Sequence, residues 1–345
     1  MNATRRRFVT AAGGATIAGL AGCTELLGSD DEYPTRSIDL QIPFPEGGGT
    51  DLESRVLADH LEDVLDVSVA PRNEGGAGGA VMYKQLSAEE ADGYTLGTFF
   101  FPLTHTHPQV MGDFDYDPSE FTYLAQYSQN TFNIMTGFDS DIETFPDIIE
   151  KAEEGPISIA FTGPVAPVAI PILQIQEELG IEFDPVFVGG GENLATEAQA
   201  GRVDIAADTF GTTMNNFAEE RNKPVAVLSE PDDELIGFYE EHLDVSVSSE
   251  LFITEHADII DEPPTLTVIR GLMTPPDLPS DVTETLEDAL DEVMTERPEW
   301  EEQMIDLGAF PAPAFGSEVE SNIEAFRDEI DPYIPLLQDF AAEHA

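Results

Sequence analysis

From residue 37 onward, segments with apolar residues at strand spacing alternate with segments with apolar residues at helical spacing. Residues 37–44 alternate as a half-buried strand does, and residues 51–65 carry apolar side chains at helical spacing. The same succession continues along the chain. Further strands are expected at residues 67–70, 94–101, 157–161, 185–188, 203–206 and 225–228, and further helices at 80–91, 168–179 and 194–200.

Strands that alternate with helices favour an α/β fold with a mostly parallel sheet built from βαβ units. Two sets of such units predict two α/β lobes. Residues 121–136 are expected to cross between the lobes as a strand and residues 266–273 to return, while amphipathic helices at 281–295 and 317–330 pack back on the first lobe. The first lobe then comprises residues 33–124 and 265–345, and the second residues 125–264.

The charge balance is extreme. The 345 residues contain 14 Lys and Arg against 69 Asp and Glu, a net charge of -55, yet 41% are hydrophobic, enough for a real core. Nucleic acid is excluded as a partner because so few cations could not neutralise a phosphate backbone. An evenly acidic, lysine-poor surface resembles the proteins of extreme halophiles. At about 1 M salt the Debye length is roughly 3 Å, so self-repulsion is largely screened.

The N-terminus has the features of an export signal. A basic region with the twin arginines Arg5 and Arg6 precedes a short apolar run, and residues 1–22 end at a small-residue cleavage site. The twin arginines resemble a Tat signal, and the tetrapeptide ending in Cys23 resembles a lipobox. We expect an exported protein, lipid-anchored through Cys23 on the outer face of the cell membrane, with residues 23–32 as a tether. The alternative is an incidental cysteine after a plain signal.

Two glycine-rich turns are the most informative feature for function. Residues 45–51 leave a strand and open a helix, so their backbone N–H groups are available to an anion beyond the strand end. A second such turn, residues 188–193, lies in the other lobe. Neither is a P-loop or a G-x-G-x-x-G fingerprint. Together they predict a clamp around a small anion; the alternative for each turn alone is a tight turn without a ligand.

Several segments carry a resemblance to a known family. They match the substrate-binding proteins of tripartite tricarboxylate transporters, also called the Bug family, in the same order and spacing over nearly the whole mature chain. The matching segments are Tyr33-Pro34, residues 42–51, Asn73 with residues 75–79, and residues 92–96, 189–191, 201–204, 225–227 and 271–275.

The resemblance implies a two-lobed type II periplasmic-binding-protein (Venus flytrap) fold with a mixed sheet in each lobe. It also implies a solute-binding protein, not an enzyme, that captures a small di- or tricarboxylate and delivers it to a membrane permease, with no cofactor and no metal. The ligand-binding residues carried over by position are Phe44, Gly47, Gly48, Gly49, Thr50, Asp51, Thr104, His105, Thr162, Gly163, Gly189, Gly190, Asp208 and Thr209.

Two departures affect the expected ligand. Val188 stands where family members usually carry a lysine, and residues 164–166 replace a Gly-Thr-x-x-His stretch. Formal positive charge is therefore not expected to be the main attraction for the ligand. Arg55, behind the first glycine turn, is expected to contribute little.

Other functions and sites fit the sequence less well. A secreted hydrolase would use Asp51 or Asp208 with His105, but no nucleophile accompanies them. A sensor's ligand-recognition subunit remains a second alternative. His105 and His107 have zinc-ligand spacing without a third ligand, so exposed loop histidines are preferred. Residues 99–101 are expected to be a buried strand end, with one ring lining the cleft as the alternative.

Overall fold

The computed structural model describes residues 33–112 and 114–344, so the export signal, Cys23 and the tether lie outside the described residues. Residues 33–345 form one compact unit. The strands are β1 (Ile38–Ile42), β2 (Val69–Asn73), β3 (Thr95–Phe101), β4 (Thr122–Gly137), β5 (Ile157–Phe161), β6 (Phe183–Phe187), β7 (Ile205–Thr209), β8 (Asn222–Val227), β9 (Thr267–Thr274) and β10 (Phe310–Phe315).

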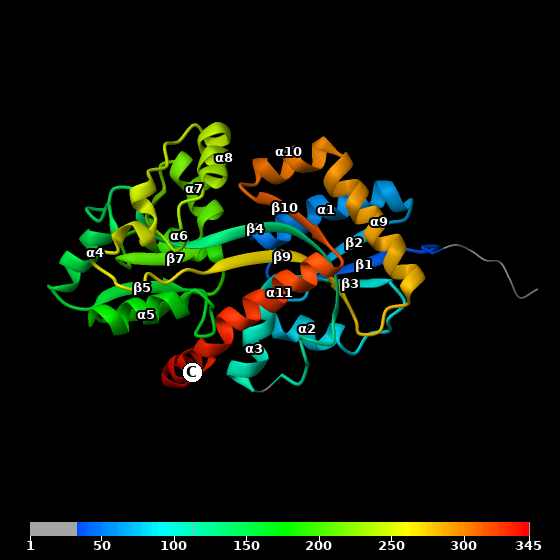
Figure 1. The fold of residues 1–345 in the computed structure, drawn as a ribbon, viewed down its shortest axis with the longest axis horizontal. Helices are drawn as coiled ribbons and strands as arrows, with labels where there is room; N and C mark the ends of the chain where they lie inside the picture. Colours follow the sequence, from blue (N-terminus) through cyan, green and yellow to red (C-terminus); the bar gives the residue numbers. More distant parts are fainter. Residues whose placement is uncertain (1–32, 113, 345) are drawn as a thin grey trace, which may run out of the picture. The chain divides into compact units, whose positions relative to one another are not determined.

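Helices connect and cover these strands (Figure 1). Within residues 33–112 and 114–344, four short segments are 3₁₀ turns. The α-helices are α1 (Gly49–Leu65), α2 (Ala80–Leu86), α3 (Leu103–Met111), α4 (Phe145–Ala152), α5 (Ala169–Leu179), α6 (Gly191–Gln199), α7 (Phe210–Ala218), α8 (Asp233–Leu243), α9 (Ser280–Glu296), α10 (Pro298–Asp306), α11 (Ser317–Ile330) and α12 (Ile334–His344).

The strands form a mixed sheet in the order β2-β1-β3-β9-β4-β7-β5-β6, with β8 and β10 also paired to β4. The pairs β1–β2, β1–β3, β5–β6 and β5–β7 are parallel, and every pair made by β4 or β9 is antiparallel. Parallel pairs on both sides of the central strands β9 and β4 confirm the predicted βαβ units.

The long strand β4 belongs to both halves of this sheet. Its first part pairs with β9 and β10, and its second part pairs with β7 and β8. Figure 1 shows β4 and β9 running side by side between the β1–β3 region and the β5–β7 region. The predicted crossing strand at 121–136 and returning strand at 266–273 are thus confirmed, and side chains on them lie between the two halves.

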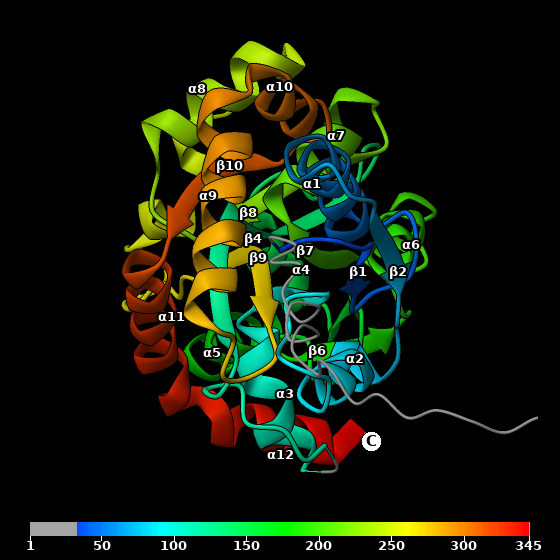
Figure 2. The ribbon, with the colours of Figure 1, turned by 90° about the vertical axis from the view of Figure 1, so that its right-hand side faces the viewer.

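Separate apolar cores lie in the two halves. In the first, α1, α9 and α10 bury residues such as Leu57, Leu290 and Trp300 against β1. In the second, α5 packs against β5, and the C-terminal helix α12 adds Phe340 to the same cluster. Figure 2 shows α12 beside both α3 and α5, with which it makes contacts. The end of the chain therefore packs with the second core.

Several elements differ from the sequence-based expectation. Residues 103–111 form α3 instead of a loop, although Pro108 lies inside the helix. The helix expected at 80–91 ends at Leu86, because the Ser87 hydroxyl bonds the carbonyl of Lys84 (2.9 Å) and the chain turns toward Gly93. Strand β10 was not among the expected elements. Its two prolines lack N–H donors, and it pairs with β4 through an irregular register.

Among the described residues, no helix combines the length and apolar character that a membrane crossing requires.

Candidate functional site

The first glycine turn leaves β1 and opens α1. Gly48 is the N-cap residue of α1, and no side chain caps the helix there. The carboxylate of Asp51 turns back and accepts a hydrogen bond from the N–H of Gly47 (2.8 Å). The N–H groups at the first turn of α1 are therefore left to a partner outside the helix, as at other anion-binding helix termini.

A buried polar network fixes this turn. Asp51 is 2% exposed and accepts hydrogen bonds from Arg55 Nε (2.8 Å) and Asn73 Nδ2 (2.8 Å). Arg55 Nη2 also donates to Asn73 Oδ1 (2.7 Å), and Asn73 Nδ2 donates to the carbonyl of Phe44 (2.9 Å). Asp51 is thus engaged in holding the turn, and Arg55 supports it more directly than its helical position suggested.

The second glycine turn lies between β6 and α6. Gly189 and Gly190 have φ of +62° and +90°, a backbone region that residues with a Cβ rarely adopt. The amide of Asn193 donates to the carbonyls of Val188 (3.2 Å) and Gly189 (2.6 Å), which fixes the turn from within. A Cβ added to Gly190 would have no neighbour within 4 Å, so this face of the turn is open.

Asp208 lies against the second turn, at the end of β7. Its Oδ1 accepts a hydrogen bond from the N–H of Thr209 (2.7 Å), whereas its Oδ2 is covered and has no hydrogen-bond partner among the described residues. A Cβ on Gly191 would lie 3.4 Å from that Oδ2. The residue is half-buried as a whole, but the carboxyl itself is withdrawn from water, and burial raises its pKa to about 6.

A buried ion pair joins α1 to β9. Arg270 Nη1 donates to Glu53 Oε1 (2.9 Å), and the Ser128 hydroxyl donates to Glu53 Oε2 (2.7 Å). Arg270 is 5% and Glu53 4% exposed. Burial raises the pKa of Glu53, and the charge of Arg270 with the bond from Ser128 opposes that shift.

Neither residue of this pair was a sequence-based candidate. The available signal was an arginine inside the apolar strand expected at 266–273, in a chain with 14 basic residues. Arg270 Nη2 lies 3.8 Å from where a Cβ on Gly49 would be, and its charge acts on the pKa of Asp208. Arg270 therefore links the surroundings of the two glycine turns.

The remaining predicted residues make contacts of different kinds. Phe44 packs edge-on against Phe100, with ring centroids 5.5 Å apart. Thr104 Oγ1 is bonded to the backbone of Phe100 (3.0 and 3.2 Å), which anchors α3 to β3. Thr209 Oγ1 bonds the hydroxyl of Thr212 (2.9 Å). Thr162 and Gly163 form the bend after β5, and Thr50 is buried in the first turn of α1.

The histidines are placed differently from the expectation of exposed loop residues. His105 and His107 lie in α3 and are 3% and 1% exposed. His105 Nε2 is 2.6 Å from Asp331 Oδ1, and its ring stacks on Phe101. The hydrolase alternative needs this ring beside Asp51 or Asp208, so the structure offers it no support. Burial lowers the pKa of His105, although Asp331 opposes the shift.

The profile of the tripartite tricarboxylate transporter family receptor (TctC) matches residues 54–234. The chain belongs to this receptor family. That family comprises substrate receptors rather than enzymes, and its members are extracytoplasmic.

Curated relatives agree with the family assignment. A UPF0065 protein of Cupriavidus necator is 27% identical over 210 residues, which are 59% of this receptor and 64% of that protein. Protein BugT of Bordetella pertussis is 47% identical over 68 residues, 20% of this receptor and 21% of BugT. The receptor thus matches less than two thirds of the length of these relatives.

Solved structures share the fold. A Rhodopseudomonas palustris protein described with adipate, Rpa4515, aligns with a TM-score of 0.77 at 18% identity, covering 89% of this receptor and 99% of that chain. MatC of the same organism, described with bound malate, aligns with a TM-score of 0.70 at 17% identity, covering 90% and 100%. The predicted α/β periplasmic-binding-protein fold is confirmed.

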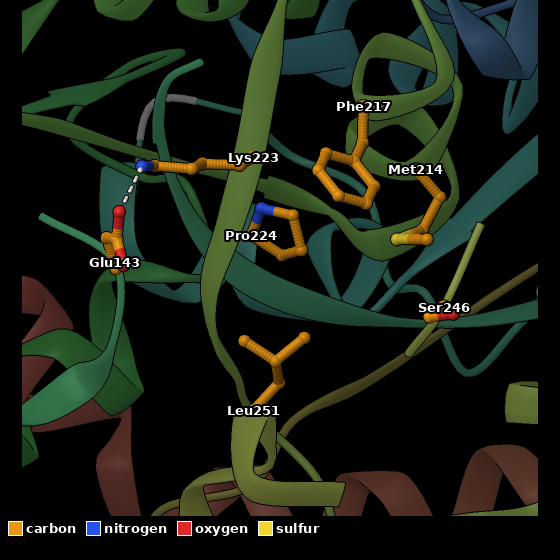
Figure 3. A pocket seen from close by; sticks show the side chains of 7 residues that line it. All are labelled: Glu143, Met214, Phe217, Lys223, Pro224, Ser246 and Leu251. Carbon is orange, nitrogen blue, oxygen red and sulfur yellow. Dashed lines mark ion pairs between the residues drawn. The ribbon is translucent and has the colours of Figure 1, made fainter. Parts of the chain in front are cut away.

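Two cavities in the described part of the receptor lie away from the glycine turns. One of about 230 Å³ opens beside β8, where Lys223 Nζ lies 3.7 Å from Glu143 Oε1 (Figure 3). Another, of about 650 Å³, is bordered by acidic residues of α4 and the end of α6. Neither is lined by a predicted ligand residue. Over residues 33–112 and 114–344, no group of three or more His, Cys, Asp or Glu could hold a metal ion.

Asp208 predicts a specific pH dependence of the receptor's stability. Burial raises the pKa of its carboxyl from 3.8 to about 6, and the N–H of Thr209 and the charge of Arg270 oppose the shift. Between these values the folded state holds a proton that the unfolded chain has released, so the free energy of unfolding falls as pH rises. We expect Asp208→Asn to remove this loss, up to about 3 kcal/mol at pH 7.

Chemical unfolding at constant molar salt, from about pH 4 to about pH 8, measures the effect as the difference between variant and wild type. Asp204→Asn is the matched control. Burial favours a raised pKa for Asp204, but bonds from Ser158 and Lys151 outweigh it and lower the pKa, so this variant should lose stability at neutral pH. Parallel pH profiles for wild type and Asp208→Asn would contradict the assignment.

Proposed function

We propose that this receptor binds a small carboxylate, specifically a di- or tricarboxylate, and delivers it to the membrane permease of a tripartite tricarboxylate transporter. The observation that carries the proposal is the pair of glycine turns, each opening a helix whose first N–H groups lack a side-chain cap. Backbone donors of this kind suit carboxylate oxygens. In a chain of net charge -55, such local donors can attract an anion despite the overall negative charge.

The comparisons support the class of ligand. The two Rhodopseudomonas palustris proteins with this fold are described with adipate and with malate, both dicarboxylates. The lysine that family members usually carry at Val188 is absent here, so the exact acid bound by this receptor is expected to differ from that of lysine-containing members.

Export and anchoring belong to the same proposal. The twin-arginine signal would carry the folded receptor across the membrane, and the lipid on Cys23 would hold it on the outer face beside its permease. Mass spectrometry of the N-terminal peptide from the purified membrane-bound protein tests the lipid on Cys23.

A thermal-shift screen of organic acids in molar salt tests the ligand. Malate, adipate, citrate and tartrate are compared with neutral sugars and peptides. A ligand at about 100 times its dissociation constant raises the free energy of unfolding by roughly 2.7 kcal/mol, which appears as a higher melting temperature. If only the neutral compounds shift the melt, the receptor is not a carboxylate receptor.

A further inference from the structure

Arg270 is an arginine buried inside the structure, in a molecule whose charge is overwhelmingly negative. It lies on β9, directly opposite Phe100 of β3 and Ser128 of β4, so the three side chains share one face of the sheet. The N-terminal turns of α1, with Gly49 and Glu53, cover that face. The guanidinium thus sits between the crossing strands and the first glycine turn.

We propose that Arg270 is a ligand-binding residue of this receptor, which receives one carboxylate of the bound acid on the edge formed by its Nε and Nη2 atoms. The inference rests on the proposed carboxylate-binding function and names the cation that this function uses.

The guanidinium is held in position by contacts that leave this edge unused. Arg270 Nη1 donates a hydrogen bond to Glu53 Oε1 (2.9 Å). The guanidinium also lies over the ring of Phe100, with 5.3 Å between its central carbon, Cζ, and the ring centroid. Glu53 is in turn fixed by the hydroxyl of Ser128. A guanidinium restrained on two sides loses little side-chain freedom when an anion binds, which favours affinity.

The unused edge has an unmet hydrogen bond. Nε of Arg270 is covered and has no partner among the described residues. A buried N–H of a charged group without a partner is costly, so an ion pair kept only for stability would be expected to satisfy it. Nε and Nη2 form the side-on fork of arginine, whose spacing matches the two oxygens of a carboxylate.

The edge formed by Nε and Nη2 lies close to the first glycine turn. Nη2 lies 3.8 Å from the point where a Cβ on Gly49 would be. A carboxylate there would meet both the fork and the uncapped start of α1. Glycine at position 49 leaves room for such an approach, and Phe44 beside Phe100 gives that end of the site an apolar wall.

Burial explains how one arginine can act in molar salt. The charged groups facing it are Glu53 and Asp208, and the Asp208 carboxyl is itself withdrawn from water. At about 1 M salt an exposed arginine is screened beyond roughly 3 Å, whereas a contact at a 5% exposed side chain is shielded from the mobile ions. The receptor therefore keeps a short-range attraction that salt does not remove.

The test is titration calorimetry in molar sodium chloride with malate, adipate and citrate. Replacing Arg270 alone would leave Glu53 buried and unpaired, so the informative variant is Glu53→Gln with Arg270→Met, which removes both charges at similar volume. We expect its affinity for the bound acid to fall by about 30-fold or more, because losing one partner of a buried charge pair costs at least about 2 kcal/mol.

Glu53→Gln alone is the matched control. It breaks the same ion pair but keeps the guanidinium, so we expect a loss of affinity clearly smaller than that of the double variant: the positive charge is still present, although Glu53 no longer restrains it. Circular dichroism without ligand checks that both variants fold. Equal affinity of wild type and double variant, or equal losses in both variants, would overturn the role of Arg270 while the carboxylate function stands. If the wild type binds none of the acids, the proposed function fails, and this inference fails with it.

Discussion

Transfer of the receptor from molar sodium chloride to dilute buffer should unfold it in one cooperative transition. Among the described residues, the buried acids are Asp51, Glu53 and the carboxyl of Asp208, so nearly all the negative charge lies at or near the surface. Lowering the salt from about 1 M to about 0.1 M lengthens the Debye length from roughly 3 Å to roughly 10 Å, and neighbouring carboxylates then repel one another. Circular dichroism during stepwise dialysis measures the loss of structure.

Repulsion between carboxylates can be distinguished from a general effect of salt on the burial of apolar groups. Sucrose strengthens burial by exclusion from the surface but screens no charge. We expect it to restore the fold at low salt much less than sodium chloride does. Equal rescue by sucrose, or a fold that stays intact in dilute buffer, would contradict the electrostatic explanation.

A point variant gives an independent check on this explanation. Partial burial and the carboxylates of Asp288, Glu320 and Glu284 raise the pKa of Glu287. Glu287→Gln should therefore lower the salt concentration needed for folding. Glu197→Gln should not, because Glu197 accepts two hydrogen bonds from Arg202 (2.6 and 2.7 Å).

Gly48→Val should abolish most ligand binding and leave the fold intact. Gly48 has φ of -80°, which valine adopts freely, and a Cβ there would meet its nearest neighbour, the carbonyl oxygen of Pro45, only at 3.9 Å. The side chain would instead occupy the space in front of the uncapped N–H groups. We expect affinity to fall by about 100-fold or more, equivalent to roughly 2.7 kcal/mol, in titration calorimetry with an unchanged melting temperature of the free receptor.

Gly190→Val tests the second turn but needs a control for backbone strain. Gly190 has φ of +90°, so valine strains the turn by about 1–3 kcal/mol whatever the ligand does. Gly180 ends α5 with φ of +64° and also has no neighbour within 4 Å of a Cβ. Gly180→Val should lose similar stability but keep its affinity. Near-normal binding in both Gly48→Val and Gly190→Val would refute the two-turn site.

Local pattern predicted strands β1 to β9, about half of the helices and the glycine turns, but not α3 or β10. The segments 121–136 and 266–273 were predicted as the crossing and returning strands, and they form β4 and β9. Helix α11 was predicted with its observed bounds, Ser317–Ile330, from its amphipathic pattern. The turn at Gly189 and Gly190 was visible because positive φ selects glycine by short-range sterics.

Charged and polar partners far apart in the sequence were decided only by the tertiary structure. Glu53 and Arg270 are 217 residues apart, and His105 and Asp331 are 226 apart. A sequence in which acids are five times as common as bases gives no means of choosing which acid an arginine meets. Periodicity records which face of an element is buried, but the pairing of buried polar groups depends on how the elements pack against one another. Sequence alone therefore identified the turns that flank the candidate site, and the packing of β9 beneath α1 placed a buried arginine between them.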